Sequence, residues 1–331
     1  MSMAAVLEAG ILACGINSAP EQLASGPNKN CRVFQVQDKK ISLVETCSTL
    51  ILRDGDDDFQ KVTAFSLDGG LLAAGSSHSL HLLSCPSLGL ACAPVSTEQE
   101  IYDATFSSDK LVVATTANLQ VYSLPGFDAG AFEKSSKKGK QKAQSIEAAA
   151  LELERTLELP SSLRGSSGGS YRSVRQHPTI PEVMYTVVNT APARTRSKST
   201  PRQGYICKWN TKNWTMEKSR KVSDRGLTCF SLSPDGRFLG YGSSDLSIGI
   251  LDAKTLATVA TILKAHEFPP TTLVFNTTSK LLVSSSADNS IRVVRVPDQV
   301  GSSGWGWSLL LVLIAVLVSI IAFAIQRYLL Q

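Results

Sequence analysis

The chain has 331 residues and a formal net charge of +5, from 33 Lys and Arg against 28 Asp and Glu. Its seven cysteines are scattered and include no C-x-x-C pair, which argues against a disulfide framework and favours reduced thiols in a reducing compartment. The excess positive charge lies in two polar segments, so a basic folded surface for nucleic acid is not expected.

The chain begins with MSMAAVLEAGILACG, which is apolar but has no basic leader and carries Glu8. A secretory signal peptide needs a positive leader followed by an uncharged apolar region, so this stretch is a poor signal peptide. Without such a signal, the bulky N-terminal part is expected to stay in the cytosol.

A short pattern recurs along the chain: an aromatic residue with Ser or Asn, a tight turn, an apolar run and a pair of small residues. Copies lie at 64–77 (AFSLDGGLLAAGSS), 105–116 (TFSSDKLVVATT), 229–244 (CFSLSPDGRFLGYGSS) and 274–286 (VFNTTSKLLVSSS). Each copy reads as two strands joined by a turn, with a third strand after it, and repeats of about 40–45 residues with this strand content are typical of propeller blades. We therefore predict an all-β fold, a WD-repeat-like β-propeller, over residues 1–298.

Six blade units are visible, at 5–47, 61–98, 100–124, 170–223, 226–265 and 271–297. The third unit is followed by a long excursion that ends in SIEAAALELERTLEL (145–159). This segment has helical composition and forms either a short helix or the last strand of the third sheet.

Three residues occupy positions with structural roles in WD-type blades. Asp245 and Asp288 fall at the tight turn before the third strand of their units, where such blades place an aspartate. His266, in Ala265-His266, stands where such blades carry Gly-His. We interpret all three as hydrogen-bonding groups of the blades and not as catalysts.

Two polar segments are expected to be flexible surface loops, at about 127–146 and 191–204. The first holds five lysines and the second four basic residues, and these nine exceed the net charge of the whole chain. The folded remainder is therefore near neutral, whereas a nucleic-acid surface needs a basic face on an ordered element. We expect no nucleic-acid partner.

No motif for covalent chemistry is present: the sequence lacks a P-loop, a G-x-G-x-x-G, an H-E-x-x-H and a G-x-S-x-G. His78, His81 and Cys85 have a metal-like spacing, but alternation along a strand explains it better, and no fourth ligand is near in sequence. We expect no metal site and no small-molecule substrate, which favours an interaction platform.

The chain ends in GSSGWGWSLLLVLIAVLVSIIAFAIQRYLLQ, with an uncharged run from Leu309 to Ile325. As a helix this run would span roughly 26 Å, close to the hydrocarbon thickness of an endoplasmic reticulum bilayer. We predict one C-terminal transmembrane helix over 309–326, after a juxtamembrane linker over 299–308 and before a short lumenal tail over 327–331. Residues that suit interfacial anchors flank it: Trp305, Trp307, Arg327 and Tyr328.

The stretch 226–297, GLTCFSLSPDGRFLGYGSS through SIRVVRVP, followed by one membrane helix, resembles a known family. This is the WD-repeat exchange factors of the endoplasmic reticulum that load a Sar-type GTPase to start COPII coat assembly, the prolactin regulatory element-binding protein family. The resemblance implies a single-pass endoplasmic reticulum protein with a cytosolic N-terminal domain. Its implied partners are a Sar-type small GTPase and the lipid bilayer.

In that family a Gly-rich loop of the first blade, organised around a potassium ion, is thought to push into the nucleotide site of the GTPase. The matching segment here is GINSAPEQLASGPNKN (15–30), with Asn28 and Asn30 as candidate catalytic residues. It departs from the family pattern because it has no run of glycines and is longer. The segments that follow it fit the family's second blade, so we expect the chain to begin one blade late relative to a family with seven blades.

Two functions follow from the resemblance and its departures. The first is guanine-nucleotide exchange on a Sar-type GTPase, promoting vesicle budding from the endoplasmic reticulum. The second is an exchange-inactive WD-repeat scaffold or trafficking helper on the same membrane, which the missing Gly-rich loop favours. Under the second, no potassium ion or other cofactor is expected.

Overall fold

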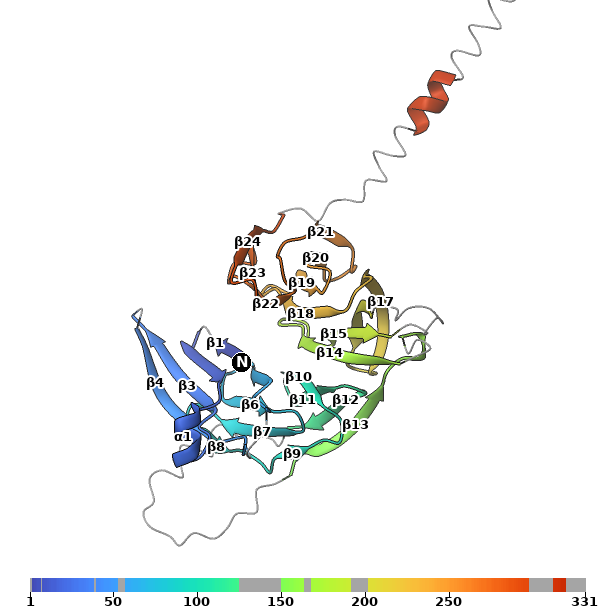
Figure 1. Ribbon diagram of the computed structural model, residues 1–331. Coiled ribbons are helices and arrows are strands. Elements are labelled where there is room, and N and C mark those ends of the chain that lie inside the picture. The colour runs from blue at the N-terminus through green and yellow to red at the C-terminus, as the bar shows by residue number, and fades with distance from the viewer. Residues whose placement is uncertain are drawn as a thin grey trace, which may run out of the picture.

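The computed structural model describes residues 2–6, 8–38, 40–52, 57–124, 150–163, 168–191, 202–297 and 312–319. Within them, consecutive antiparallel sheets are arranged around a central axis as the blades of a propeller (Figure 1). The predicted all-β, six-bladed propeller is confirmed. Of the segments expected to be loops, 127–146 lies outside the described residues, and so does 191–204 apart from residue 191 and residues 202–204.

Each of the first two blades begins with its innermost strand. The first sheet contains β1 (Ser2–Val6), β2 (Ile11–Gly15), β3 (Cys31–Gln37) and β4 (Lys40–Cys47), with helix α1 (Pro20–Ser25) between β2 and β3. The second contains β5 (Val62–Phe65), β6 (Leu71–Gly75), β7 (Ser79–Ser84) and β8 (Gly89–Leu90), and β9 (Val95–Ser96) also pairs with β7.

The middle two blades are regular four-stranded meanders. The third contains β10 (Ile101–Phe106), β11 (Lys110–Thr115), β12 (Asn118–Ser123) and β13 (Glu152–Glu158). A 3-10 turn, η1 (Ser161–Leu163), leads to the fourth, with β14 (Gly169–Gln176), β15 (Val183–Thr190), β16 (Gln203–Asn210) and β17 (Thr215–Ser223).

The last two blades differ in strand number. The fifth contains β18 (Leu227–Leu232), β19 (Phe238–Ser243), β20 (Ile248–Asp252) and β21 (Thr258–Ile262). The sixth contains only three strands within the described residues: β22 (Pro270–Phe275), β23 (Leu281–Ser286) and β24 (Ile291–Arg295). The outer edge of β24 is therefore unpaired in the described part of the chain.

Burial is greatest in the second strand of several blades and least in the outermost strand. Every residue of β6 (LLAAG) and of β19 (FLGYGS) is buried, because neighbouring blades cover both faces of these strands. Such strands read as continuous small and apolar runs without the alternation of a half-buried strand. The outer strands β4 and β13 are mostly exposed, and β4 nevertheless carries apolar side chains.

The described part of the segment 145–159 takes the second of its two predicted forms, the last strand of the third sheet. Residues 152–158 form β13, which pairs antiparallel with β12 and places Leu157 opposite Leu119 and Leu153 opposite Tyr122. Leu157 packs against the core between the third and fourth blades. The unpaired edge of β12 and this apolar seam outweigh the helical composition of the segment.

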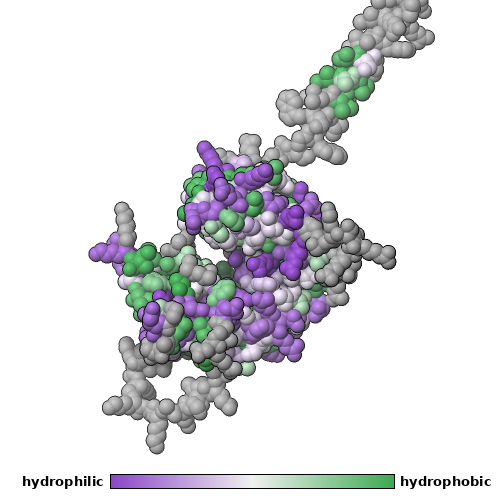
Figure 2. All heavy atoms as spheres, in the orientation of Figure 1, coloured by the Kyte–Doolittle hydropathy of each residue, from purple (hydrophilic) through white to green (hydrophobic). Residues whose placement is uncertain are grey.

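The core lies between blades and not within them. Five apolar clusters join each blade to the next, from the first and second to the fifth and sixth. Packing between first strands follows the same order, β1 with β5, β5 with β10, β10 with β14, β14 with β18 and β18 with β22. Among the described residues no such cluster joins the sixth blade to the first, and a gap separates them in Figures 1 and 2.

Both sheets that border this gap expose apolar faces. On the sixth blade, Val274, Val283 and Val293 form a cross-strand row on the face opposite to the one that packs on the fifth blade. On the first blade, Leu12, Phe34 and Leu43 form a similar row, with the exposed Met3 and Ile41 on either side of it. Figure 2 shows apolar side chains gathered over this first sheet.

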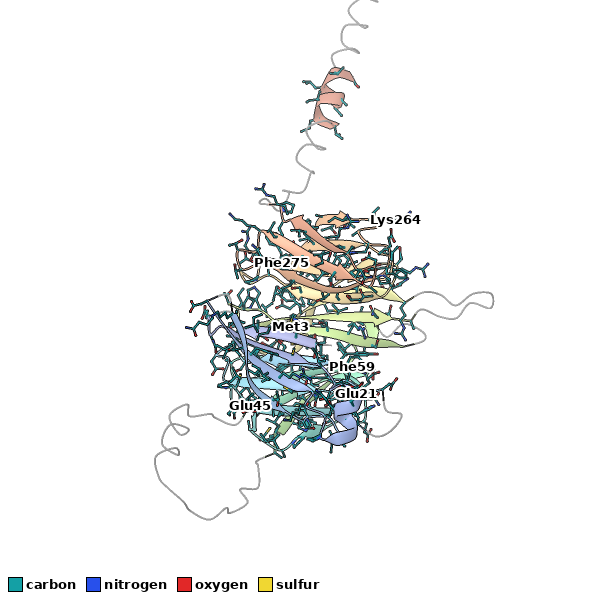
Figure 3. All side chains as sticks on the ribbon, turned by 60° about the vertical axis from the view of Figure 1, so that its left-hand side comes forward. Met3, Glu21, Glu45, Phe59, Lys264 and Phe275 are labelled. Atoms are coloured by element: carbon teal, nitrogen blue, oxygen red, sulfur yellow. The ribbon has the colours of Figure 1, made fainter. Side chains whose placement is uncertain are left out.

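One end of the ring will be called the strand-start face, because the first strand of every blade begins there. The loop from β2 to β3, the segment before β5 and the segment after β21 all belong to this end. Glu21, Phe59 and Lys264, which lie in these three segments, are found along one side of the molecule in Figure 3.

Beyond the propeller, residues 312–319 are helical, and their side chains are exposed. In the described part of the chain, no helix combines the length and apolar character needed to cross a bilayer. The predicted linker 299–308, most of the predicted membrane helix, the tail 327–331 and the anchors Trp305, Trp307, Arg327 and Tyr328 lie outside the described residues.

Candidate functional site

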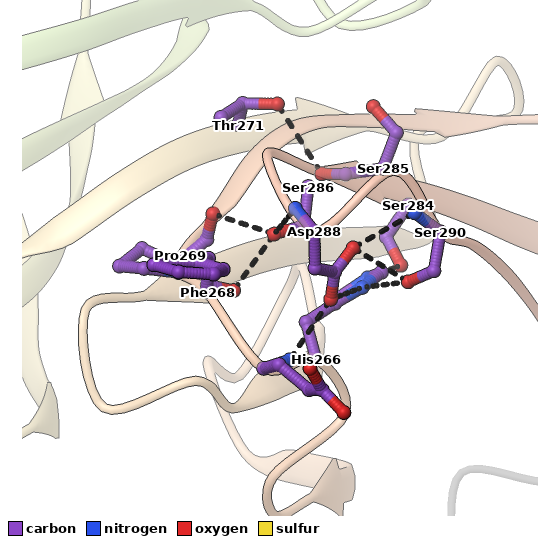
Figure 4. Close-up of polar contacts among 10 residues, drawn as sticks. His266, Phe268, Pro269, Thr271, Ser284, Ser285, Ser286, Asp288 and Ser290 are labelled. Carbon is purple, nitrogen blue, oxygen red and sulfur yellow. Dashed lines mark hydrogen bonds and ion pairs between the residues drawn. The ribbon is translucent and has the colours of Figure 1, made fainter.

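A polar network surrounds His266 in the sixth blade (Figure 4). The His266 Nε2 atom lies 2.9 Å from Ser284 Oγ, and Nδ1 lies 2.8 Å from Ser290 Oγ and 3.2 Å from Asp288 Oδ2. The backbone N–H groups of Glu267 and Ser290 each donate to Asp288 at 2.8 Å. The network thus ties the segment before β22 to β23 and to the turn before β24.

The carboxyl group of Asp288 is almost fully covered, with its side chain 5% exposed. Burial by itself would raise the pKa of Asp288. The hydrogen bonds from Ser290 and from the backbone of Glu267 outweigh burial, and so does the nearby His266. Together they hold the pKa of Asp288 well below its usual range. Asp288 is therefore ionised at neutral pH, and its carboxylate faces the Nδ1 atom of His266.

Asp245 occupies the matching turn of the fifth blade, without a histidine partner. Its Oδ1 atom accepts from the backbone N–H of Ser247 at 3.0 Å, and its Oδ2 atom accepts from Ser223 Oγ at 3.0 Å. Burial opposes the charge, but these hydrogen bonds outweigh it, and the pKa of Asp245 is lowered. In both blades the aspartate fixes the turn before the third strand.

The loop from β2 to β3, residues 16–30, holds the two candidate asparagines on the strand-start face. At its base, the backbone N–H of Ile16 donates to the carbonyl of Asn30 at 2.9 Å. Gly15 precedes it, and a Cβ atom there would lie 2.5 Å from the Cβ of Gln60, so only glycine fits at this point. The loop therefore leaves the sheet through a closed and tightly packed neck.

Asn28 links the two arms of this loop. Its Oδ1 accepts from the backbone N–H of Ser18 at 2.9 Å, and its Nδ2 donates to Asn17 Oδ1 at 3.2 Å. The backbone N–H of Lys29 in turn donates to Ser18 Oγ at 3.1 Å. Since Asn28 is 4% exposed, its amide is committed to holding the loop together.

Asn30 is fully buried and connects the loop to the next blade. Its Nδ2 donates to Thr49 Oγ1 at 2.7 Å and to Gln60 Oε1 at 3.0 Å, and its Oδ1 accepts from the backbone N–H of Thr49 at 2.9 Å. Among the loop residues whose side chains are described, the exposed ones are instead Ile16, Ala19, Glu21, Gln22, Pro27 and Lys29.

Neither candidate asparagine has a side-chain oxygen without a hydrogen-bond partner to offer a potassium ion. Such an ion is held by several oxygen atoms that are free to face it. Here the side-chain oxygens of Asn28 and Asn30 and the carbonyls of Ala19, Asn28 and Asn30 all accept hydrogen bonds within the chain. Among described side chains, the buried oxygen without a hydrogen-bond partner is Gln176 Oε1, in the fourth blade.

No group of three His, Cys, Asp or Glu side chains that could hold a metal ion occurs in the described ranges. His81 lies on β7, and Cys85 follows the end of that strand. Burial lowers the pKa of His81 and raises the pKa of Cys85 to about 11, so both groups are uncharged at neutral pH. The sequence interpretation of a strand explains their spacing.

The predicted site residues do not converge on one place. His266 and Asp288 are in contact, Asp245 lies in the preceding blade, and Asn28 and Asn30 lie in the first. Sequence reasoning missed a hollow on the strand-start face that gathers Arg172, Arg202 and Arg225. Arg172 and Arg225 lie near the starts of innermost strands and Arg202 near the start of the third strand of its blade, so no single sequence pattern joins them.

Comparisons with known proteins agree with the fold. The model of the WD domain, G-beta repeat, matches residues 257–294, which include His266 and Asp288, so the predicted WD repeat is confirmed. SEC12-like protein 2 of Arabidopsis thaliana is 29% identical over 126 residues. That match covers 38% of this chain and 30% of the length of the relative. The six-bladed ring, the WD repeat and this similarity fit a Sec12-type WD-repeat protein.

Proposed function

We propose that this chain is a guanine-nucleotide exchange factor for a Sar-type small GTPase, acting in transport from the endoplasmic reticulum. The observation that carries the proposal is the similarity to a SEC12-like protein on a chain that folds as a WD-type propeller. We assign it to the prolactin regulatory element-binding protein family on the same ground. Exchange needs no covalent chemistry, only tighter binding of the nucleotide-free GTPase than of its nucleotide-bound form.

The loop 16–30 is the element that we assign to contact with the GTPase. Its neck is rigid, because Asn28 and Asn30 fix both arms, and its exposed tip stands on the strand-start face. A rigid loop loses little entropy when it inserts into a partner. In this arrangement the asparagines position the loop, and Lys29 and its exposed neighbours touch the partner.

The test is release of a fluorescent guanine nucleotide from a purified Sar-type GTPase, with the full chain added in non-ionic detergent. Acceleration of at least tenfold is expected. Lys29→Ala, which keeps the backbone bonds of the loop, should lower the acceleration at least threefold. Lys254→Ala, at an exposed lysine in the turn between β20 and β21 on the opposite face, is the matched control and should leave the acceleration unchanged.

A scaffold without exchange activity is the second candidate. It is favoured by the loop, whose candidate asparagines are buried and have their side-chain oxygens engaged in hydrogen bonds within the chain. A folded chain that binds the nucleotide-free GTPase but leaves nucleotide release at its intrinsic rate would establish this function and overturn exchange. A chain that neither binds the GTPase nor accelerates release would overturn both.

We also propose that the C-terminal segment anchors the chain in the endoplasmic reticulum membrane, with the propeller in the cytosol. Support comes from the exposed apolar side chains of residues 312–319 and from the uncharged run of the sequence around them. Removal of residues 301–331 should move the protein from carbonate-washed membranes to the soluble fraction. Retention of the shortened chain in washed membranes would contradict the proposal. So would glycosylation at Asn213 or Asn276, which stand in Asn-x-Thr acceptor sequences that are modified only in the lumen.

A further inference from the structure

A hollow of about 440 Å³ opens on the strand-start face, between the third, fourth and fifth blades. Its lining includes Tyr102 at the start of β10, Arg172 near the start of β14 and Thr228 near the start of β18. Arg202 and Arg225 belong to the segments that lead into β16 and β18 and complete the rim. A volume of this size is within the range of small-molecule sites, about 300–1,000 Å³.

The floor of the hollow is rigid. The Asn189 side chain is buried, and its Oδ1 accepts from the backbone N–H of Leu227 at 2.8 Å while its Nδ2 donates to the Leu227 carbonyl at 2.9 Å. This pair of bonds fastens the end of β15 to the start of β18. A Cβ atom on Gly204 would lie 2.5 Å from Leu227 Cγ, so β16 begins against the same residue.

The three arginines are held close to one another by this floor. The Arg172 guanidinium stacks over the ring of Tyr102, with its carbon 4.5 Å from the ring centroid. A Cβ atom on Gly226 would lie 3.7 Å from the Cβ of Arg202, so Arg202 begins its side chain beside the residue that follows Arg225. The side chains therefore start from a fixed arc around the mouth of the hollow.

The positive charge of the hollow is not neutralised within the chain. No Asp or Glu lines it, and in the described ranges no hydrogen bond or ion pair engages the guanidinium of Arg172, Arg202 or Arg225. The carboxylates nearest in sequence have other partners: Asp224 pairs with Lys221 at 2.6 Å, and Asp245 accepts from Ser223 and Ser247. Like charges gathered in this way repel one another until an anion joins them.

We propose that this hollow binds a phosphate monoester, carried by a small molecule or by a lipid headgroup. Arginine guanidinium groups match phosphate oxygens with paired hydrogen bonds, and three unpaired positive charges suit a dianion better than a single carboxylate. The stack on Tyr102 orients one guanidinium before the ligand arrives. The site is separate from the loop 16–30, and the proposal does not depend on nucleotide exchange.

Isothermal titration calorimetry of the full chain in non-ionic detergent tests the proposal with three probes: inorganic phosphate, inositol bisphosphate as the headgroup of a phosphoinositide, and glutarate as a dicarboxylate. Each phosphate-bearing probe should bind with a stoichiometry of one molecule per chain. Its affinity should fall as the salt concentration rises. Arg172→Gln and Arg225→Gln should each weaken binding at least tenfold. Arg237→Gln is the matched control, since Arg237 stacks on Phe238 at 5.1 Å at the opposite end of the fifth blade, and it should change nothing.

The probes separate the sources of the ligand. Inositol bisphosphate that binds at least tenfold tighter than inorganic phosphate indicates a lipid headgroup, and equal affinities indicate a free phosphate compound. Glutarate that binds as tightly as the phosphates would overturn the phosphate assignment. The proposal is also overturned if none of the probes binds, or if binding persists in the two variants while their thermal unfolding matches that of the original chain.

Discussion

Single aspartates carry much of the local order of the blades. Asp288 is buried against His266, Ser290 and the backbone of Glu267, and its pKa is held low by these donors in spite of burial. A group whose pKa is lowered on folding stabilises the folded state above its unfolded pKa. That stabilisation is lost as the pH falls toward the folded pKa.

The first prediction concerns Asp288→Asn. The variant should be less stable than the original chain by a constant amount above about pH 5, because the unfolded aspartate, with a pKa of about 3.9, is ionised there. The difference in the free energy of unfolding should shrink as the pH falls below about 4. Urea denaturation at several pH values measures it. Asp109→Asn, at a residue whose side chain is 68% exposed, is the control, and a difference for Asp288→Asn that grows at low pH would refute the argument.

A glycine also acts at this scale. Gly249 on β20 lies opposite Tyr241 on β19, and a Cβ atom there would lie 2.1 Å from the Tyr241 ring. The ring is almost fully buried and cannot move aside freely.

Gly249→Ala should therefore lower the free energy of unfolding by about 1–3 kcal/mol through overpacking. Thermal or urea denaturation measures the change, and the added Tyr241→Leu substitution should recover part of the loss. Gly89→Ala is the matched control, because the nearest atom to a Cβ at this position, Ser87 Oγ, would lie 3.9 Å away. Equal effects of the two alanines would show that loss of backbone freedom, and not the ring, decides the outcome.

At the scale of elements, the sequence identifies strands through the repeated pattern, and it fails where tertiary pairing decides. Four of the six blades, the second, third, fifth and sixth, each contain a copy of the motif with its own turn and apolar run. The segment 145–159 carries Ala, Glu and Leu, so its composition cannot show that β12 offers an edge to pair with. The arginine hollow was beyond sequence reasoning for a similar reason, since it forms only when three blades stand side by side.

The prediction for this element compares β13 with the same residues in isolation. A peptide of residues 145–159 should show helix and no strand in trifluoroethanol, whereas in the protein the amides of Glu152–Glu158 should exchange slowly. Hydrogen-exchange mass spectrometry measures the protection. The amides of β21 (Thr258–Ile262), an outer strand of the fifth blade, give the reference. Exchange of β13 as fast as in the peptide would show that the pairing is not maintained in solution.

At the scale of the whole molecule, the ring has two apolar faces that no described residue covers. Val293 on the sixth blade is 62% exposed. Leu282 lies on the opposite face of the same sheet and is fully buried against the fifth blade. Exposed apolar rows of this kind bind hydrophobic dyes and promote association.

Lysine substitutions at Val293 and Leu282 test which face of the sixth sheet is exposed to solvent. Val293→Lys should leave the melting temperature within a few degrees of the original and should reduce dye binding and self-association, because the charge stays in water. Leu282→Lys should unfold the protein, since it places a charge in the core. Differential scanning fluorimetry and light scattering measure both effects. A large loss of stability in Val293→Lys would show that this face is covered in solution.

The order of the apolar clusters also governs how the propeller comes apart. Each blade is joined only to its sequence neighbours, so the described ring is a linear array of units with nearest-neighbour coupling, and its stability is a sum along a line. The first and sixth blades have one seam each, and the four between them have two. Unfolding should therefore fray inward from both ends, leaving the third and fourth blades as the last structured part, and the chain can assemble blade by blade as it leaves the ribosome.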